Sequence, residues 1–337
     1  MKQIVELQPG ERSEVFNEAG ATLGLPPSYV EKDFWVCWTL GVLFGDPVSG
    51  QHLTFRGGTS LSKGWGLIRR FSEDIDLAMA RVWVEAKLPD PGEAGINTAE
   101  RDRRFKRLRD ACRQAIRDKL YPLLTTEVAK LGGEAKVELE DLDQARDPFV
   151  IKLHYPKGAI KAPGDYSQAV VKIELSGRAD DWPQEARGIS PYVFKALPQL
   201  GKSDPVNVQC VLPRRTFWEK AALLHEQHTR PEAKALAVRQ ARHLYDLVQL
   251  WESVSKDAEL VKLFPGVMMH RQAFYGYSWV NYAKLKPGDL KLAPPEDRMR
   301  DWRLDYQAMA TMFFEEPPEF DRLVASLREI KTKLGAL

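Results

Sequence analysis

Apolar and polar residues alternate along much of the first two thirds of the chain, a pattern typical of β-strands with one buried face. Longer stretches with an apolar residue every three to four positions predict helices. The predicted strands are residues 53–55, 74–79, 135–140, 149–155, 169–175 and 206–212. The predicted helices are residues 11–23, 29–44, 61–69, 98–131, 217–227, 232–252, 297–314 and 318–334. Residues 176–205 are polar and rich in turn residues, so we expect loops there. The pattern predicts an α/β region with a sheet and an inserted helix over residues 1–213, and a helical region over residues 214–337.

The expected start of the first C-terminal helix comes from a capping signal. Thr216 and Glu219 have the spacing of a capping box, which would open a helix at Phe217. Lys220 would then lie in the first turn, where a cation opposes the helix dipole unless an anion is nearby. In the next predicted helix, Arg242 and Asp246 are four residues apart, a spacing that allows them to pair on one face. A structural ion-pair network of Lys220, Arg242 and Asp246 is the alternative to a functional role for these residues.

Composition is that of an ordinary globular protein, with 44% hydrophobic residues in 337. No apolar run reaches transmembrane length and the first twenty residues lack a signal-peptide pattern, so a cytoplasmic location is expected, with no membrane partner. Cys37, Cys112 and Cys210 lack metal-ligand spacing and are expected to be reduced thiols. The net charge of +2 does not indicate a nucleic-acid binder. Residues 101–109 are locally very basic, which is compatible with a solvated helix face or with contact to an RNA backbone.

The most informative segment joins a glycine turn to a pair of aspartates. The run Arg56-Gly-Gly-Thr-Ser-Leu-Ser-Lys63 is followed, after a short predicted helix, by Phe71-Ser-Glu-Asp-Ile-Asp-Leu77. Alternate side chains of a strand share one face, so Asp74 and Asp76 are expected to point the same way. Adjacent carboxylates repel unless a cation neutralises them, and Mg²⁺ held by one or two carboxylates and substrate phosphates is a common solution. The backbone N–H groups of residues 57–60, at a predicted helix start, suit a phosphate. The two runs together predict a nucleotide-phosphate site.

Each half of this segment also has an ordinary structural interpretation. An Asp-x-Asp pair is often a solvated strand end, and a Gly-Gly-Thr-Ser run is often a turn before a helix cap. The order of strand, glycine turn, helix and acidic strand over residues 53–79 favours the functional interpretation. In the strand at residues 169–175, Lys172 and Glu174 share one face, which could carry a third carboxylate or could simply be half exposed.

These runs resemble the AbiEii/AbiGii family of toxin nucleotidyltransferases, which belong to the DNA polymerase beta superfamily. The resemblance extends over most of the chain and is poorest at residues 85–150. His243 stands where many short members carry an aspartate, which is similar to the longer members. The further similar segments are Glu31-Lys-Asp33, residues 216–222, Arg242-His-Leu-Tyr-Asp-Leu247, His270-Arg271 and Asp305-Tyr306.

The resemblance implies a polymerase-beta-type mixed sheet with flanking helices and a C-terminal helical domain that completes the active site. It assigns Asp74, Asp76 and Glu174 to Mg²⁺ or Mn²⁺, and it implies that Lys32 or Asp33 braces the site. Lys220 would contact the triphosphate, with Asp246 orienting it or contacting the nucleotide sugar. The expected nucleotide-binding residues are Gly57, Gly58, Thr59, Ser60, Lys63, Ser72 and Arg242.

The reaction that the resemblance implies is transfer of a nucleoside monophosphate from an NTP to RNA. The implied acceptor is the 3′ end of tRNA, and the enzyme would be a toxin restrained by a co-encoded antitoxin. An acceptor hydroxyl would attack the α phosphate in line and expel pyrophosphate. Two alternatives remain: nucleotidyl transfer to a protein or small molecule, and nucleotide binding without turnover. The aromatic residues between 274 and 282 are more typical of core packing than of base stacking.

Overall fold

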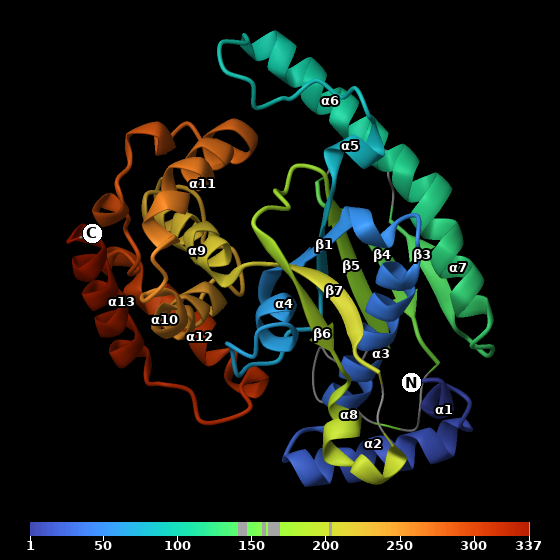
Figure 1. Cartoon of the computed structure of the whole chain (residues 1–337). Coiled ribbons are helices and arrows are strands. Elements are labelled where there is room, and N and C mark those ends of the chain that lie inside the picture. The colour runs from blue at the N-terminus through green and yellow to red at the C-terminus, as the bar shows by residue number, and fades with distance from the viewer. Residues whose placement is uncertain (141–146, 157–159, 161–168, 202–203, 337) are drawn as a thin grey trace. The chain divides into compact units, whose positions relative to one another are not determined.

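The structure is a computed structural model that describes residues 1–140, 147–156, 160, 169–201 and 204–336 (Figure 1). The chain divides into two compact units. The first unit comprises Met1–Trp65, Phe71–Pro89 and Asp102–Val211, and the second comprises Gly66–Arg70, Asp90–Arg101 and Leu212–Leu337. The second unit therefore takes in two short segments from the first 101 residues, which a single boundary after residue 213 does not describe.

The first unit is built on a seven-stranded mixed sheet with the strand order β3-β4-β5-β2-β1-β7-β6. β2 runs antiparallel to β1 and parallel to β5, and β1 runs parallel to β7. The pairs β3–β4, β4–β5 and β6–β7 are antiparallel. The predicted α/β fold with a mixed sheet is confirmed, and β2 lies in its middle. The strands are β1 (Leu53–Arg56), β2 (Ile75–Met79), β3 (Lys136–Leu139), β4 (Phe149–His154), β5 (Val170–Ser176), β6 (Gln184–Ile189) and β7 (Val206–Val211).

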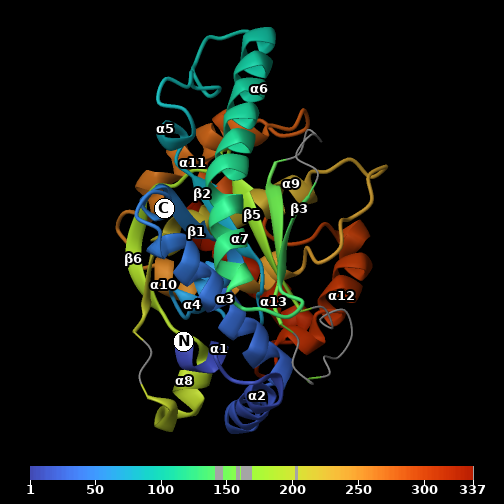
Figure 2. The same ribbon diagram turned by 90° about the vertical axis from the view of Figure 1, so that its right-hand side faces the viewer.

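Helices of the first unit cover the apolar face of this sheet (Figure 2). α3 (Pro27–Gly45) packs against β5, β7 and α7 (Tyr121–Ala129), and α2 (Pro9–Leu23) packs against α3. Ile151 and Ile173 are fully buried, whereas their neighbours Lys152 and Lys172 are partly exposed. The period of two predicted for β4 and β5 is therefore present, and their second face carries charged side chains. The remaining α-helices of this unit are α1 (Lys2–Val5), α4 (Gly57–Lys63), α5 (Arg81–Val84), α6 (Thr98–Ala115) and α8 (Tyr192–Ala196).

The predicted helix at residues 98–131 is confirmed as one continuous helical path. α6 passes through a π-helical turn, Ile116–Leu120, into α7. Gly132 and Gly133 follow with φ angles of 67° and 62°. Such positive φ angles favour glycine over residues with a Cβ, so this pair stops the helix where the sequence predicts.

The second unit is helical, as predicted. α9 packs against α10 and α11, and α13 packs against α10. Trp218 is buried in this core: its indole N–H donates to the carbonyl of Leu260 at 2.7 Å, and its ring lies 4.8 Å from that of Phe264. The α-helices are α9 (Pro213–His228), α10 (Arg242–Val254), α11 (Leu260–Tyr275), α12 (Met299–Gln307) and α13 (Phe320–Gly335).

The expected start of α9 is wrong. The helix begins at Pro213 after the N-cap Leu212, because proline is preorganised for the first helical position and needs no N–H partner there. Thr216 and Glu219 form no capping box at this start. Instead, Glu219 accepts a hydrogen bond from Arg215 at 3.0 Å. Lys220 consequently lies in the middle of the helix and not in its first turn.

The expected start of α10 at residue 232 is also wrong. Arg239 has a φ angle of 62°, which a helix does not accommodate, and α10 begins at Arg242. The carboxylate of Asp305 accepts hydrogen bonds from the backbone N–H of Arg239 at 2.5 Å and of Ala241 at 2.7 Å. A contact from 64 residues away therefore caps this helix.

Two further elements differ from the sequence prediction. α4 spans Gly57–Lys63 instead of residues 61–69, so the glycine run forms the first turn of the helix itself. β6 lies within the segment expected to be loop, because it pairs along its whole length with β7. Among the described residues, no helix has the length and apolar character needed to span a membrane. Cys37, Cys112 and Cys210 are buried and free, as expected.

Candidate functional site

Asp76 and Glu174 lie side by side on the adjacent parallel strands β2 and β5. The register pairs Asp76 with Glu174 on one side and with Arg56 of β1 on the other. Ile75 and Leu77 are buried, so they fix the opposite direction for Asp76. The structure thus brings together carboxylates that are about a hundred residues apart in the sequence.

Asp74 immediately precedes β2 and is partly exposed, like Asp76 and Glu174. The two-residue spacing from Asp76 brings it close to this pair. Lys172, two residues before Glu174 on β5, forms an ion pair with Glu174. Burial alone would lower the pKa of Lys172, but the hydrogen bond and charge of Glu174, with the charges of Asp74 and Glu140, raise it above its usual value.

Gly57 stands directly against the carboxylate of Asp76. Its φ angle is 76°, and a Cβ atom at this position would overlap an Asp76 carboxylate oxygen. Only glycine accommodates both the backbone conformation and this close approach. The glycine run and the first acidic strand are therefore built as one unit, as the sequence order suggests.

The buried hydroxyl groups of Thr59 and Ser60 form hydrogen bonds with other side chains of the protein. Thr59 is buried and donates to the hydroxyl of Ser72 at 2.9 Å. Ser60 is buried and forms a hydrogen bond with the thiol of Cys210, whose pKa is raised to about 11 by burial. These contacts tie α4 to the segment before β2 and to β7. The nucleotide-binding roles of Gly57, Gly58 and these two hydroxyl residues stay predictions.

The ammonium group of Lys63 is enclosed within the first unit. It lies 2.6 Å from the carboxylate of Asp33, donates to the carbonyl of Ser190 at 2.9 Å and stands 3.6 Å from the ring centroid of Tyr192. Burial alone would lower the pKa of Lys63, but the Asp33 carboxylate raises it above its usual value. The structure uses this lysine to join α4 to α3, whereas a phosphate contact by Lys63 stays a prediction.

α3 also supports the residues that lead to the aspartates. Lys32 forms an ion pair with Glu73, and its side chain is 8% exposed. Tyr29 stacks on Phe71, with ring centroids 4.0 Å apart. Asp33 accepts a hydrogen bond from the backbone N–H of Tyr192 at 2.7 Å. These contacts join α3 to the segment before β2 and to α8, and the implied role of Lys32 or Asp33 in bracing an active site stays a prediction.

Within the second unit, Asp246 holds two buried cations. Arg70 donates to both carboxylate oxygens, each at 2.7 Å, and Lys220 lies 2.8 Å from one of them. Asp246 is 0% exposed. The predicted pair of Arg242 and Asp246 is therefore wrong, because Asp246 pairs with Arg70 and Lys220. Asp246 contacts Lys220 as an orienting partner would, but that role stays a prediction, and the complete burial of Asp246 leaves no surface for a nucleotide sugar.

This cluster contains more positive than negative charge. Burial alone would raise the pKa of Asp246, but the charges of Arg70 and Lys220 hold it well below its usual value. Burial and the charge of Lys220 hold the pKa of His243 well below its usual range, so His243 is neutral. Burial also lowers the pKa of Lys220, with Arg70 and Arg242 adding to this effect against Asp246. An anionic ligand near Lys220 and Arg242 would relieve this imbalance.

Sequence analysis did not single out Arg70. It directly precedes the Phe71-to-Leu77 run, but its partner Asp246 is 176 residues away. Local periodicity contains no signal for such a contact. The position of a basic residue next to the acidic run could have marked it as a candidate.

The aromatic residues of the C-terminal third are partly core. Phe274 and Tyr282 are buried, and the hydroxyl of Tyr282 donates to Glu226, which also pairs with Arg271. Tyr277 is 42% exposed. On α6, Arg107 pairs with Glu85, so part of the basic stretch is neutralised. RNA contact by this helix stays a prediction.

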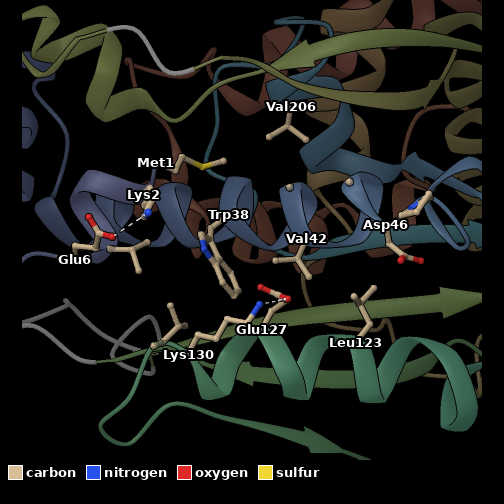
Figure 3. A pocket seen from close by; sticks show the side chains of 15 residues that line it. Met1, Lys2, Glu6, Trp38, Val42, Asp46, Leu123, Glu127, Lys130 and Val206 are labelled. Carbon is tan, nitrogen blue, oxygen red and sulfur yellow. Dashed lines mark hydrogen bonds and ion pairs between the residues drawn. The ribbon is translucent and has the colours of Figure 1, made fainter.

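A cavity of about 920 Å³ lies in the first unit between α1, α3 and α7 (Figure 3). Its apolar lining includes Trp38, Val42 and Leu123. Its charged lining consists in part of two ion pairs, Lys2–Glu6 and Glu127–Lys130. None of the predicted site residues lines it. The cavity is therefore separate from the carboxylate group.

The donor chemistry of the carboxylate group fits a hard divalent cation. Asp74, Asp76 and Glu174 offer oxygen atoms only, which suit Mg²⁺. Across the described residues, no three Asp, Glu, His or Cys side chains lie close enough together to hold a metal ion by themselves. Mg²⁺ sites that act on nucleotides need fewer protein ligands, because substrate phosphates and water complete the coordination.

A nucleotide-phosphate site on a mixed sheet is the class of site that these residues indicate. The family model described as "Nucleotidyl transferase AbiEii toxin, Type IV TA system" matches residues 41–326. The chain therefore belongs to the AbiEii family of nucleotidyltransferase toxins, as its motifs predict.

Among solved structures, MenT4, a nucleotidyltransferase toxin from Mycobacterium tuberculosis H37Rv, is similar at 16% identity. The match covers 96% of this chain and 98% of that chain, with a TM-score of 0.40. This likeness is too low to transfer the role of any residue. No curated protein matches the chain.

Proposed function

We propose that the chain is a divalent-metal-dependent nucleotidyltransferase toxin that transfers a nucleoside monophosphate from an NTP to the 3′ end of tRNA. The observation that carries this proposal is the register pair of Asp76 and Glu174, with Gly57 against the Asp76 carboxylate. A carboxylate pair beside a glycine-rich helix start combines ligands for a cation with N–H groups for a phosphate.

In this proposal each residue has a distinct task. Asp74, Asp76 and Glu174 would hold Mg²⁺ or Mn²⁺, and such a cation would supply charge neutralisation for the triphosphate. The backbone of residues 57–60 and the hydroxyl of Ser72 position the phosphates. The family resemblance gives Lys220, which Asp246 holds, a contact with the triphosphate, and it makes Arg242 a nucleotide-binding residue.

The bond changes follow from this arrangement. The acceptor hydroxyl oxygen attacks the α phosphorus, the bond from that phosphorus to the bridging oxygen breaks, and pyrophosphate leaves. Glu174 accepts the hydroxyl proton directly or through water. No covalent enzyme intermediate is needed, and positioning and charge neutralisation supply the rate enhancement.

The acceptor and the partner are proposed from the family. RNA is the acceptor that the resemblance implies, and Arg103 and Lys106 on α6 are exposed and could meet its backbone. Membership in a type IV toxin–antitoxin family supports a cognate antitoxin. The site of action would be the cytoplasm, where NTPs and tRNA are both present.

The test is transfer of label from each α-³²P nucleoside triphosphate to total tRNA in the presence of Mg²⁺. We expect labelled tRNA with wild type and none with the Asp74→Asn, Asp76→Asn double variant. Asp110→Asn is a control that removes one exposed acidic charge from α6. Label on protein or a small molecule instead of tRNA would reject the RNA acceptor. No NTP consumption by wild type would reject nucleotidyl transfer.

A further inference from the structure

Lys172 stands among the predicted metal ligands, although the proposed reaction gives it no task. Its ammonium group forms an ion pair with Glu174. The two side chains are 40% and 23% exposed, so they lie at the surface of the sheet's charged face. A cation of the protein itself therefore occupies the carboxylate that is expected to bind a divalent cation.

The strand register explains how Lys172 reaches this position. Glu174 is paired with Asp76, and Ile173 is paired with Ile75. Lys172, one residue earlier on β5, is consequently level with Asp74, one residue before β2. Lys172 thus has Glu174 two residues along its own strand and Asp74 at the adjacent position across the sheet.

The neighbouring strand β4 shows that this placement is specific to Lys172. Lys152 is the register partner of Lys172 on β4 and is similarly exposed, at 34%. Its ammonium group lies 2.8 Å from Glu140 and 3.9 Å from Glu138, on the side away from β2. Two adjacent lysines therefore have different partners, and only one of these two pairs with a predicted metal ligand.

We propose that Lys172 is a built-in counter-cation that occupies Glu174 and must release it before Glu174 binds a divalent cation. This inference rests on the proposed function. An ammonium group and Mg²⁺ compete for the same carboxylate oxygens, so Lys172 weakens metal binding. In the metal-free state it also offsets the negative charge of Glu174 and Asp76, which lie side by side. Lys172 is thus a residue that sets the metal concentration at which the site fills.

The experiment measures Mn²⁺ binding to the full chain without nucleotide, by the loss of the free-Mn²⁺ electron paramagnetic resonance signal. We expect Lys172→Met to bind Mn²⁺ about threefold to fivefold more tightly than wild type, since an exposed ion pair contributes up to about 1 kcal/mol. Lys172→Arg keeps the competing cation and is expected to bind like wild type. A gain in affinity cannot come from misfolding, so the direction of the change is informative.

Lys152→Met is the matched control, because it removes the same charge from the adjacent register position. We expect its Mn²⁺ affinity to change by less than about twofold, since Lys152 pairs with Glu140 and Glu138 and does not occupy a predicted metal ligand. Equal tightening in both variants would reject the competition between Lys172 and the metal. Unchanged or weaker binding by Lys172→Met would also overturn the proposal.

The failure of this inference is distinguishable from the failure of the proposed function. If Mn²⁺ binding is lost in the Asp74→Asn, Asp76→Asn variant but is unaffected by Lys172→Met, the metal site stands and the role of Lys172 is rejected. If wild type binds Mn²⁺ no better than the double variant, the metal site itself is rejected and this inference falls with it.

Discussion

Arg70 forms a bidentate ion pair with Asp246, in which its Nε and Nη2 atoms each lie 2.7 Å from a different carboxylate oxygen. The guanidinium is 2% exposed and the carboxylate is 0% exposed. The contact spans 176 residues, and Lys220 shares the same carboxylate. Asp246 therefore fixes both the segment just before Phe71 and the lysine expected to meet the triphosphate.

Replacing Arg70 by Ala is expected to destabilise the protein strongly. The change removes two charge-assisted hydrogen bonds from the fully buried Asp246, which keeps only Lys220, and the expected loss is about 3 kcal/mol in the free energy of unfolding. Urea denaturation followed by tryptophan fluorescence measures this loss. Arg303→Ala is the control, because its partner Asp321 is exposed and no measurable change is expected. Similar midpoints for Arg70→Ala and wild type would contradict the structural role of the pair.

Gly57→Ala is expected to abolish nucleotidyl transfer. The added methyl group would overlap the Asp76 carboxylate and displace a predicted metal ligand. Gly66→Ala is a matched control: Gly66 also has a positive φ angle, 65°, but no atom lies within 4 Å of an added Cβ. In both variants the positive φ angle is expected to cost about 1 kcal/mol of stability through backbone strain. We expect at least about a hundredfold loss of activity in Gly57→Ala only, and equal losses would reject the steric argument.

Lys63 can be tested as a brace or as a phosphate ligand by a double-mutant cycle with Asp33. If it is a brace, Lys63→Met lowers the free energy of unfolding by about 3–5 kcal/mol, because Asp33 is left buried without its partner. Adding Asp33→Asn should then recover part of this loss, which is a non-additive effect. A stable Lys63→Met variant with a raised KM for the NTP would instead favour the phosphate contact.

The lowered pKa of His225 is expected to make the stability of the second unit depend on pH. Burial lowers the pKa of His225 to about 4, with the charges of His228 and Lys291 adding to the effect. The folded state therefore favours the neutral ring, whose Nδ1 atom accepts a hydrogen bond from the backbone N–H of Lys291 at 3.1 Å. A group with a depressed folded pKa stabilises the protein above its unfolded pKa, about 6.5, and this contribution is lost as the pH falls towards 4.

His225→Asn isolates this contribution, because the amide oxygen can accept the same hydrogen bond but does not titrate. The measurement is the free energy of unfolding of both proteins between pH 4 and pH 7. We expect wild type to lose stability relative to the variant as the pH falls through this window. Parallel curves for the two proteins would show that His225 is not held neutral.

Local pattern alone fixed much of the candidate site. Alternation within residues 74–79 and 169–175 determined that Asp74 and Asp76 share a direction and that Glu174 faces away from Ile173. The Gly-Gly pair determined that the chain could turn without a side chain at Gly57. These properties depend on a period of two residues and on the conformational freedom of glycine, which a sequence contains directly.

Tertiary structure decided which of these residues meet. The pairing of Asp76 with Glu174 and of Arg70 with Asp246 depends on strand order and on helix packing between segments 98 to 176 residues apart, which no local period encodes. The same reason explains the wrong start of α10 and the wrong partner expected for Asp246. Asp305 caps α10 from a distant helix, and Asp246 takes Arg70 and Lys220 in place of its sequence neighbour Arg242. The sequence determined which side chains each segment places on one face, and long-range packing determined which residues those side chains contact.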